Sequence, residues 1–337
     1  MTGFLDIKNL TVRFDTEDGQ IAAVSDVSYT MREGEVLGVV GESGSGKSVH
    51  ALAIMRLVPL PHGRIESGEI WFRERDLLGL SRRRMRRVRG GQIAMIFQDP
   101  ISSLNPVYTV GFQIKESLRV HLRMGRHAAT VRAAELLDMV GIPDARRRLR
   151  SYPHELSGGM RQRVMIAMAL ACNPRLIIAD EPTTALDVPI QAQIIDLIKR
   201  LQAELNLTVI WISHDLGIVA GFAQTVNVMY AGHIVERGAV RDIYHRPRHP
   251  YTVGLLGSVP RLDQKTDGKL TPIPGRPPNL ARLGPGCPFA PRCVHADGRC
   301  HAEMPPIEES DGEGHIVRCW HWRRMLEGDR RAQASRV

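Results

Sequence analysis

The sequence has no long uninterrupted run of apolar residues. Its longest run, Val164–Cys172, contains nine residues, whereas a membrane-spanning helix needs roughly 18 or more. The N-terminal stretch Met1–Phe14 also lacks the basic start and the apolar centre of an export signal. These two absences lead us to expect a chain that stays in the cytoplasm and has no transmembrane helix of its own.

Aromatic residues are scarce, at 5% of the 337 residues, although the net charge is +9. Such a charge can indicate a nucleic-acid partner, because Lys and Arg displace counterions from phosphates. The densest basic cluster has no interleaved aromatic residue for base stacking; it comprises Arg82, Arg83, Arg84, Arg86, Arg87 and Arg89. We interpret it as the solvated face of a helix and expect no nucleic-acid partner. A surface close to anionic lipid would also tolerate it.

Short apolar runs indicate the strands of a buried sheet. Val36–Val40, Leu176–Asp180 and Val209–Ser213 resemble parallel strands that are buried on both faces. Other predicted strands are Leu5–Ile7, Leu10–Phe14, Ala22–Met31 and a hairpin of Val226–Tyr230 with His233–Glu236. The predicted fold class is therefore α/β, with a mostly parallel sheet and N-terminal antiparallel strands.

Helical patterns and composition divide the chain. A helix is predicted at Val49–Leu57, and another where Ile190, Ile194 and Leu197 recur at helical spacing. The Arg-rich segment 100–154 is also helical, and we interpret it as an insertion. From Arg246 onward, prolines, glycines and four of the five cysteines accumulate. We therefore predict a domain at 1–245, with a helical subdomain at about 100–160, and a loop-rich extension at 246–337.

A complete phosphate-loop motif follows the first buried strand. The segment Gly41–Ser48 fits G-x-x-x-x-G-K-[ST] at every fixed position, with a strand before it and a helix after it. The glycines allow backbone N–H groups to surround phosphate oxygens at a helix N-terminus. Lys47 would reach the β- and γ-phosphates of ATP, and Ser48 would ligate Mg²⁺. The candidate ATP-binding residues here are Gly41, Ser43, Gly44, Ser45, Gly46, Lys47 and Ser48.

Two acidic residues end the second buried strand. Asp180 is placed to help hold Mg²⁺, and Glu181 is the candidate that polarises the attacking water. Adjacent residues on a strand point apart, so the two acids can do separate work. The alternative for Glu181 is a simple ion pair with a nearby arginine.

A second glycine motif precedes these acids. Ser157 is a suitable N-cap for a helix that starts at Met160, and Gly158 and Gly159 permit close backbone approach. Because Lys47 already serves the γ-phosphate in the same chain, we predict that this motif contacts ATP held by a partner chain. A plain capped helix is the alternative.

The order of these motifs resembles that of ATP-binding subunits of ABC transporters, over roughly residues 5–245. The matching segments are the phosphate loop, Gln98, Leu156–Gln162, Asp180-Glu181, Thr184–Asp187 and His214. The resemblance implies a P-loop ATPase core and a role for Gln98 in sensing Mg²⁺ and the attacking water. It also implies that Asp187 touches the partner across a dimer and that His214 contacts the γ-phosphate. Phe14 occupies the place of an aromatic that stacks on adenine, although a core position is equally compatible.

Several segments narrow the resemblance to one branch. Met160 stands where the commonest form of the second glycine motif has glutamine. Phe97–Pro100, followed by Ser103–Pro106, resembles the peptide-transporter branch. In the extension, His249–Thr252 and Ile273–Pro278 resemble a segment of dipeptide, oligopeptide and nickel importers.

Four cysteines in the extension form a C-x5-C-x6-C-x18-C pattern: Cys287, Cys293, Cys300 and Cys319. In a reducing cytoplasm such a group favours a metal site over two disulfides. The short C-x2-C pairs of a zinc ribbon are absent. The spacing resembles the iron–sulfur site of some importers of this branch, which implies a [4Fe–4S] cluster; Zn²⁺ or unligated thiols are the alternatives. Cys172, on an apolar helix, is interpreted as a core residue.

The resemblance implies an ATPase at the cytoplasmic face of the inner membrane. It would pair with a second ATPase subunit, expected as a heterodimer with a homodimer as the alternative, and with two membrane-spanning permease subunits. An extracytoplasmic binding protein would deliver dipeptides or oligopeptides, or alternatively a nickel chelate or another small solute. The same ATP-binding motifs also fit an exporter, a soluble ABC ATPase of DNA repair or translation, and a scaffold that binds nucleotide without hydrolysing it.

Overall fold

The computed structural model describes residues 3–17, 19–184, 186–258, 273–310 and 314–325, and the chain forms two compact units. The first unit combines the segments Met1–Met31, Val36–Leu78 and Ser213–Val337. The second unit combines Arg32–Glu35 with Gly79–Ile212. The phosphate loop and the extension therefore belong to the first unit, and the helical insertion belongs to the second.

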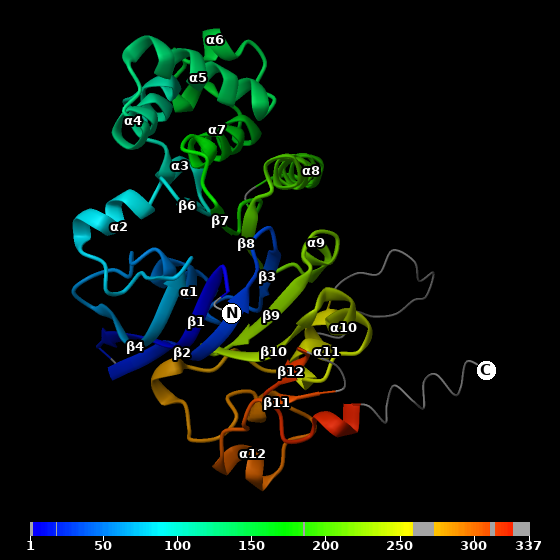
Figure 1. Ribbon diagram of the computed structural model, residues 1–337. Helices are drawn as coiled ribbons and strands as arrows, with labels where there is room; N and C mark the ends of the chain where they lie inside the picture. Colours follow the sequence, from blue (N-terminus) through cyan, green and yellow to red (C-terminus); the bar gives the residue numbers. More distant parts are fainter. Residues whose placement is uncertain (1–2, 18, 185, 259–272, 311–313, 326–337) are drawn as a thin grey trace. The chain divides into compact units, whose positions relative to one another are not determined.

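An antiparallel sheet with strand order β2-β1-β4-β5 lies in the first unit (Figure 1). Its strands are β1 (Leu5–Thr16), β2 (Gly19–Met31), β4 (Gly63–Phe72) and β5 (Arg75–Asp76). The two predicted N-terminal stretches form one continuous strand, β1. They look separate in the sequence because the alternation of buried residues is interrupted inside this strand. Asn9 has a φ of 47°, and the register with β2 shifts between Ile7 and Leu10. This bulge returns Leu10 to the buried face.

The first unit also holds part of a second sheet. There β3 (Val36–Val40) pairs in parallel with β9 (Thr225–Tyr230), which pairs antiparallel with β10 (His233–Ala239). The predicted hairpin is confirmed: Ala231 and Gly232 have φ values of 48° and 83°, as a two-residue type I′ turn requires. Two short strands of the extension, β12 (Ile316–Val317) and β11 (Glu308–Glu309), continue from β10.

Short helices complete the first unit. The predicted helix at Val49–Leu57 begins earlier and ends earlier, as α1 (Lys47–Ile54), because the phosphate loop itself starts the first turn. The other helices are α9 (Leu216–Ala220), α10 (Val240–His245), α11 (Pro250–Gly257) and α12 (Gly298–Ala302), with 3-10 turns at Leu280–Arg282 and Ala290–Arg292. In the described part of the extension, loops predominate over these short elements.

The second unit carries three parallel strands and the predicted helical insertion. The strands β6 (Ile93–Ile96), β7 (Leu176–Asp180) and β8 (Thr208–Ser213) pair in the order β8-β7-β6. The helices are α2 (Arg82–Val88), α3 (Pro100–Ser103), α4 (Val110–Leu122), α5 (Arg126–Met139), α6 (Ala145–Arg148), α7 (Gly158–Leu170) and α8 (Val188–Leu205), with a 3-10 turn at Pro153–Glu155. These elements confirm the α/β fold class.

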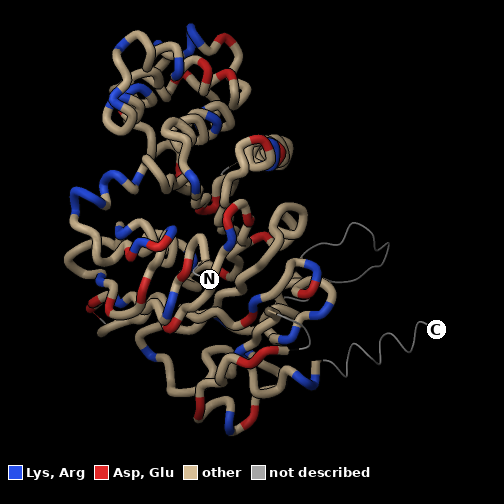
Figure 2. The backbone as a smooth tube through the Cα atoms, in the orientation of Figure 1, with Lys and Arg blue, Asp and Glu red and all other residues tan. Residues whose placement is uncertain are grey.

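Five of the six arginines of the basic cluster lie on the exposed surface of α2, as predicted, whereas Arg89 follows the helix and is half-buried. The five arginines within α2 are exposed, whereas Met85 and Val88 are buried, and Figure 2 shows the basic residues along this helix. Within the described ranges, no helix is both long enough and apolar enough to cross a membrane.

Candidate functional site

The phosphate loop connects the end of β3 to the start of α1 in the first unit. Its glycines are required by close backbone contacts: a Cβ on Gly41 would lie 2.2 Å from the Met229 carbonyl oxygen. A Cβ on Gly46 would lie 2.2 Å from the carbonyl oxygen of Ala23, and Gly46 has a φ of 99°. The sequence therefore folds this segment as the tight loop that the motif predicts.

Lys47 and Ser45 supply polar groups to this loop. The Lys47 side chain is buried, and its Nζ donates to the carbonyl oxygens of Gly41 and Glu42 at 2.7 and 2.9 Å. The Ser45 Oγ is buried and has no hydrogen-bond partner among the described residues. An unpaired buried hydroxyl in a loop that leads into a helix N-terminus fits a bound phosphate. Ser48 follows on the first turn of α1.

A histidine lies on α1, two residues after the end of the phosphate loop. His50 is buried, and its Nε2 lies 2.7 Å from the Tyr29 hydroxyl. Burial lowers the pKa of His50 from 6.5 to about 4, because the interior disfavours the charged ring. This histidine is therefore neutral near pH 7 and belongs to the core beneath the loop.

In the second unit, the acidic pair lies at the carboxyl end of β7. Asp180 is buried, and Glu181 has a φ of 45°, a left-handed turn that separates the two acids. The Glu181 Oε2 accepts from the Thr184 hydroxyl at 2.9 Å and from Gln98 Nε2 at 3.4 Å. Gln98 follows β6, which pairs in parallel with β7 at Ile96 and Ala179. The structure thus brings Gln98 and Glu181 together and adds the Thr184 hydroxyl as a second hydrogen-bond donor to Glu181.

His214 follows β8 and is exposed, and it lies in the first unit. The neighbouring Asp215 caps α9, since its carboxylate accepts from the Gly217 N–H at 2.7 Å. The local backbone is therefore fixed on both sides of His214. Its predicted contact with the γ-phosphate stays a prediction.

Ser157 is the N-cap of α7, and its Oγ accepts from the Met160 N–H at 3.4 Å. A Cβ on Gly159 would lie 2.8 Å from Ile190 Cγ2, so this glycine permits close packing of α7 against α8. Ser157 and Gly158 are both exposed. The capped helix is thus present, and its predicted contact with a partner's ATP is compatible with that exposure.

Two other predicted residues occupy accessible places. Asp187 is exposed at the N-cap of α8, while Ala185 of the same motif lies outside the described residues. Phe14 is half-buried on β1, opposite Gly63, whose added Cβ would lie 2.6 Å from the Phe14 ring. Both proposed roles, partner contact and adenine stacking, stay predictions.

The four cysteines of the extension are free thiols that lie close enough to affect one another's pKa. Burial, with smaller contributions from the neighbouring cysteines, raises the pKa of Cys287 to about 11 and that of Cys319 to about 12. The Cys287 N–H donates to the Cys300 carbonyl oxygen at 2.8 Å, which holds two of the four segments together. A cation among these sulfurs would favour their thiolate form.

One smaller group lies beside these cysteines. Asp297, Cys300 and His321 place their ligand atoms within 4.8 Å of one another. No trio of cysteine sulfurs in the described part of the chain is that close. By contrast, the interpretation of Cys172 is confirmed: it is buried, and burial raises its pKa to about 11.

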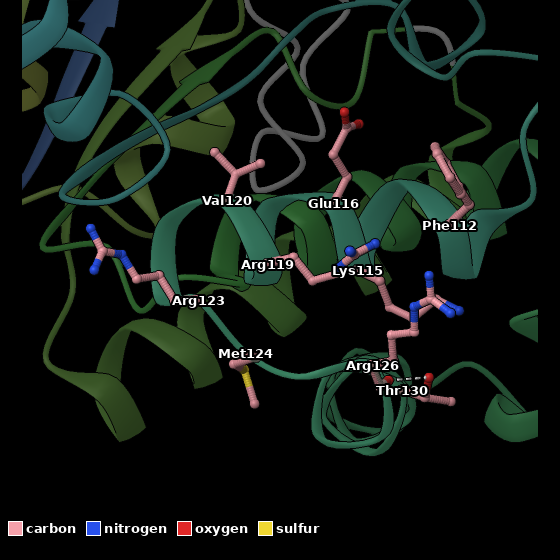
Figure 3. Close-up of a pocket in the computed structure, with 9 residues that line it drawn as sticks. All are labelled: Phe112, Lys115, Glu116, Arg119, Val120, Arg123, Met124, Arg126 and Thr130. Atoms are coloured by element: carbon pink, nitrogen blue, oxygen red, sulfur yellow. Dashed lines mark hydrogen bonds between the residues drawn. The ribbon is translucent and has the colours of Figure 1, made fainter.

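A surface pocket lies between α4 and α5 in the helical insertion (Figure 3). It is lined by Phe112, Lys115, Glu116, Arg119, Val120, Arg123, Met124, Arg126 and Thr130. Four of these nine residues are basic and one is acidic. Phe112 and Val120 expose 45% and 67% of their surface, so the pocket combines apolar contact area with positive charge.

Comparison with known proteins decides the family. Residues 24–184 match the family model described as "ABC transporter", and residues 235–300 match "Oligopeptide/dipeptide transporter, C-terminal region". The oligopeptide transport ATP-binding protein OppD of Salmonella typhimurium is 53% identical over 304 residues, covering 90% of each chain. This chain belongs to the ABC transporter ATPases of the oligopeptide/dipeptide transporter family.

Further relatives agree with this assignment. The OppD protein of Bacillus subtilis is 51% identical over 320 residues, covering 95% of this chain and 89% of its own. A dimeric structure of the ATP-binding cassette MJ0796 with ADP and Pi is 30% identical, with a TM-score of 0.63; the match covers 70% of this chain and 99% of that cassette. Membership of this ABC family establishes that the protein is an ATPase and that its ATP hydrolysis is coupled to transport.

Proposed function

We propose that this chain is the ATP-hydrolysing subunit that powers import of dipeptides or oligopeptides across the cytoplasmic membrane. The observation that carries the proposal is one polypeptide with a complete phosphate loop, an acidic strand end and the C-terminal region of oligopeptide/dipeptide transporters. A nickel chelate or another small solute is the alternative cargo. The similarity to OppD proteins favours peptides.

The residues of the sequence motifs would have separate roles in binding and hydrolysing ATP. Lys47 and the loop amides would hold the phosphates, and Ser48, Gln98 and Asp180 would hold Mg²⁺, whose charge neutralises that of the phosphates when it is bound. Glu181 would orient the attacking water and accept its proton. The hydrogen bonds from Thr184 and Gln98 support this role, because they hold the Glu181 carboxylate in one orientation.

The second glycine motif would act across a dimer. Ser157, Gly158 and Gly159 present an exposed helix N-terminus, and Asp187 is exposed at the start of α8. A partner ATPase subunit would bring its own phosphate loop to this N-terminus, so that ATP joins two chains. The dimeric MJ0796 cassette, which is similar to this chain, supports that arrangement. We propose that the partner is a different ATPase chain, so that the pair is a heterodimer; a homodimer is the alternative.

The helical insertion is the proposed contact with the two permease subunits. Its α4–α5 pocket offers apolar and basic side chains on one surface, and Val107 and Tyr108 just before α4 are exposed at 71% and 45%. An amphipathic segment of a permease would bind there through its apolar face. With such a contact the ATPase would lie at the cytoplasmic face of the inner membrane, and an extracytoplasmic binding protein would supply the solute.

A metal group in the extension is the last part of the proposal. Four free thiols in one extension, without the short C-x2-C pairs of a zinc ribbon, support a [4Fe–4S] group held by Cys287, Cys293, Cys300 and Cys319. When bound, such a cluster would supply a rigid centre that joins four loop segments. Zn²⁺ is the alternative.

Replacement of the proposed water-orienting acid tests the enzymatic part. Glu181→Gln should still bind ATP but release phosphate at least about 100-fold more slowly, since the amide cannot accept the proton. Glu204→Gln, an exposed acid of α8 that pairs with Arg200, is the matched control and should keep normal turnover. Unchanged phosphate release in Glu181→Gln would favour the non-catalytic scaffold instead.

The cargo is tested on the complex that co-purifies with this chain from membranes. Added dipeptides or oligopeptides should stimulate its ATPase activity in the presence of the extracytoplasmic binding protein. Stimulation by a nickel chelate alone would move the proposal to the alternative solute. Purification without membrane proteins would favour a soluble ATPase.

A further inference from the structure

An arginine of the C-terminal extension contacts the phosphate loop directly. Arg292 ends the 3-10 turn Ala290–Arg292, and its side chain is 5% exposed. Its Nη1 and Nη2 donate to the two carboxylate oxygens of Glu42, at 2.6 and 3.0 Å. Glu42 is the second residue of the loop. The extension and the loop therefore share a bidentate ion pair between residues that lie 250 positions apart.

Other contacts hold the guanidinium of Arg292 in place. Its Nε donates to the Pro274 carbonyl oxygen at 2.8 Å, and its Nη1 donates to the Tyr230 hydroxyl at 3.3 Å. The guanidinium also lies over the rings of Tyr230 and Phe289, at 5.8 and 6.0 Å from their centroids. These contacts hold the guanidinium in one orientation, facing the Glu42 carboxylate.

The backbone of Glu42 is held as well. Its N–H donates to the hydroxyl of Tyr251, a fully buried residue of α11, at 2.7 Å. Its carbonyl oxygen accepts from Lys47 Nζ at 2.9 Å and from the Ser45 N–H at 3.2 Å. The loop conformation at Glu42 thus depends on two residues from beyond the central strands, Tyr251 and Arg292.

The turn that carries Arg292 is also the turn of the first two extension cysteines. The Ala290 N–H donates to the Cys287 carbonyl oxygen at 3.0 Å, and the Cys293 N–H donates to the Ala290 carbonyl oxygen at 3.2 Å. Any group held by the thiols of Cys287 and Cys293 would restrict this turn. The position of Arg292 is therefore tied to the cysteine site on one side and to the phosphate loop on the other.

Glu42 carries a negative charge within a loop that receives a polyphosphate. An unpaired carboxylate there would repel the phosphates and would be free to change rotamer. We infer that Arg292 is a positioning residue for ATP binding, which neutralises and orients Glu42 and thereby couples the cysteine-bearing turn to the phosphate loop. The inference rests on the proposed function only in that this loop binds ATP.

Equilibrium binding of a fluorescent ATP analogue to the full chain tests this inference. Arg292→Gln should raise the Kd about tenfold, within the usual range of coupling between sites. Arg292→Lys should lie between Arg292→Gln and wild type, because an ammonium group keeps the charge but not the paired donors. In the double variant Arg292→Gln/Glu42→Gln the repelling charge is gone, so its Kd should return towards the wild-type value. A double variant as weak as Arg292→Gln alone would refute the charge argument.

Arg318 provides a matched control. Its side chain is 8% exposed, it precedes Cys319 as Arg292 precedes Cys293, and it pairs with Asp26 at 3.0 Å rather than with the loop. Arg318→Gln should leave the Kd within about twofold of wild type. An equal loss of affinity in both arginine variants would show that disturbed packing of the extension, not the pair with Glu42, is responsible, and would overturn the inference.

Hydrogen exchange provides the reciprocal readout, because coupling between two sites acts in both directions. Saturating ATP should slow amide exchange in the segment 287–293 of the wild type and have little effect there in Arg292→Gln. If the wild type itself failed to bind ATP, the proposed function would fail. If the wild type and Arg292→Gln bound ATP equally, only the positioning role of Arg292 would be refuted.

Discussion

Removal of the Thr184 hydroxyl is the most direct test of how the site orients Glu181. The Thr184 Oγ1 donates to Glu181 Oε2 at 2.9 Å, whereas the contact from Gln98 is longer, at 3.4 Å. A hydrogen bond to a charged acceptor contributes about 1.5–3 kcal/mol, and water replaces part of this at an exposed residue such as Thr184. We therefore expect Thr184→Val to lose about 1.4 kcal/mol of transition-state stabilisation, which lowers kcat about tenfold.

The assay is steady-state phosphate release at saturating MgATP, with nucleotide affinity measured separately. Thr184→Val should change kcat and leave the affinity close to that of wild type, because the contact is made to the water-orienting acid. Thr184→Ser keeps the hydroxyl and is the matched control, with turnover close to wild type. Wild-type kcat in Thr184→Val, or an equal loss in both variants, would refute the orienting role.

Three further predictions concern other parts of the molecule. The pKa of His50 is about 4 in the folded state and 6.5 in the unfolded state. The unfolded state therefore binds the proton first, and the free energy of unfolding falls as the pH drops from 6.5 towards 4. Urea unfolding at pH 5.5 should show that this group lowers the free energy of unfolding by about 1 kcal/mol. Anaerobically purified protein should contain iron and sulfide that Cys287→Ser loses and Cys172→Ser retains, and one equivalent of zinc without iron would exclude the cluster. In the Glu181→Gln chain, Ser157→Arg should abolish ATP-dependent association with the partner ATPase subunit, and association at unchanged ATP concentration would contradict the shared site.

The buried strands and the phosphate loop are predictable because local sequence decides them. A run such as Val36–Val40 buries its apolar side chains on both faces only as a strand inside a sheet. The glycines of Gly41–Ser48 are needed wherever this loop forms. The β9–β10 hairpin is equally local, because Ala231-Gly232 adopts the two positive φ values that its turn needs. Short-range geometry is enough for each of these elements.

The continuous β1 strand and the start of α1 could not be predicted in the same way. The bulge at Asn9 depends on the register with β2, which is a property of the paired strands and not of either sequence alone. Helix α1 begins at Lys47 because the loop backbone already turns into the helix at Gly46. Tertiary and loop geometry set both boundaries.

The chemical groups of this protein were determined by its sequence: a loop for phosphates, a pair of acids, a capped glycine helix and four cysteines, each recognisable from residue types at fixed spacing. The tertiary structure decided which of them touch. Thr184 and Gln98 meet on Glu181, and Arg292 reaches Glu42 from 250 residues away. No local pattern encodes such a pairing, because it arises only when packing of the extension brings distant segments of the chain together.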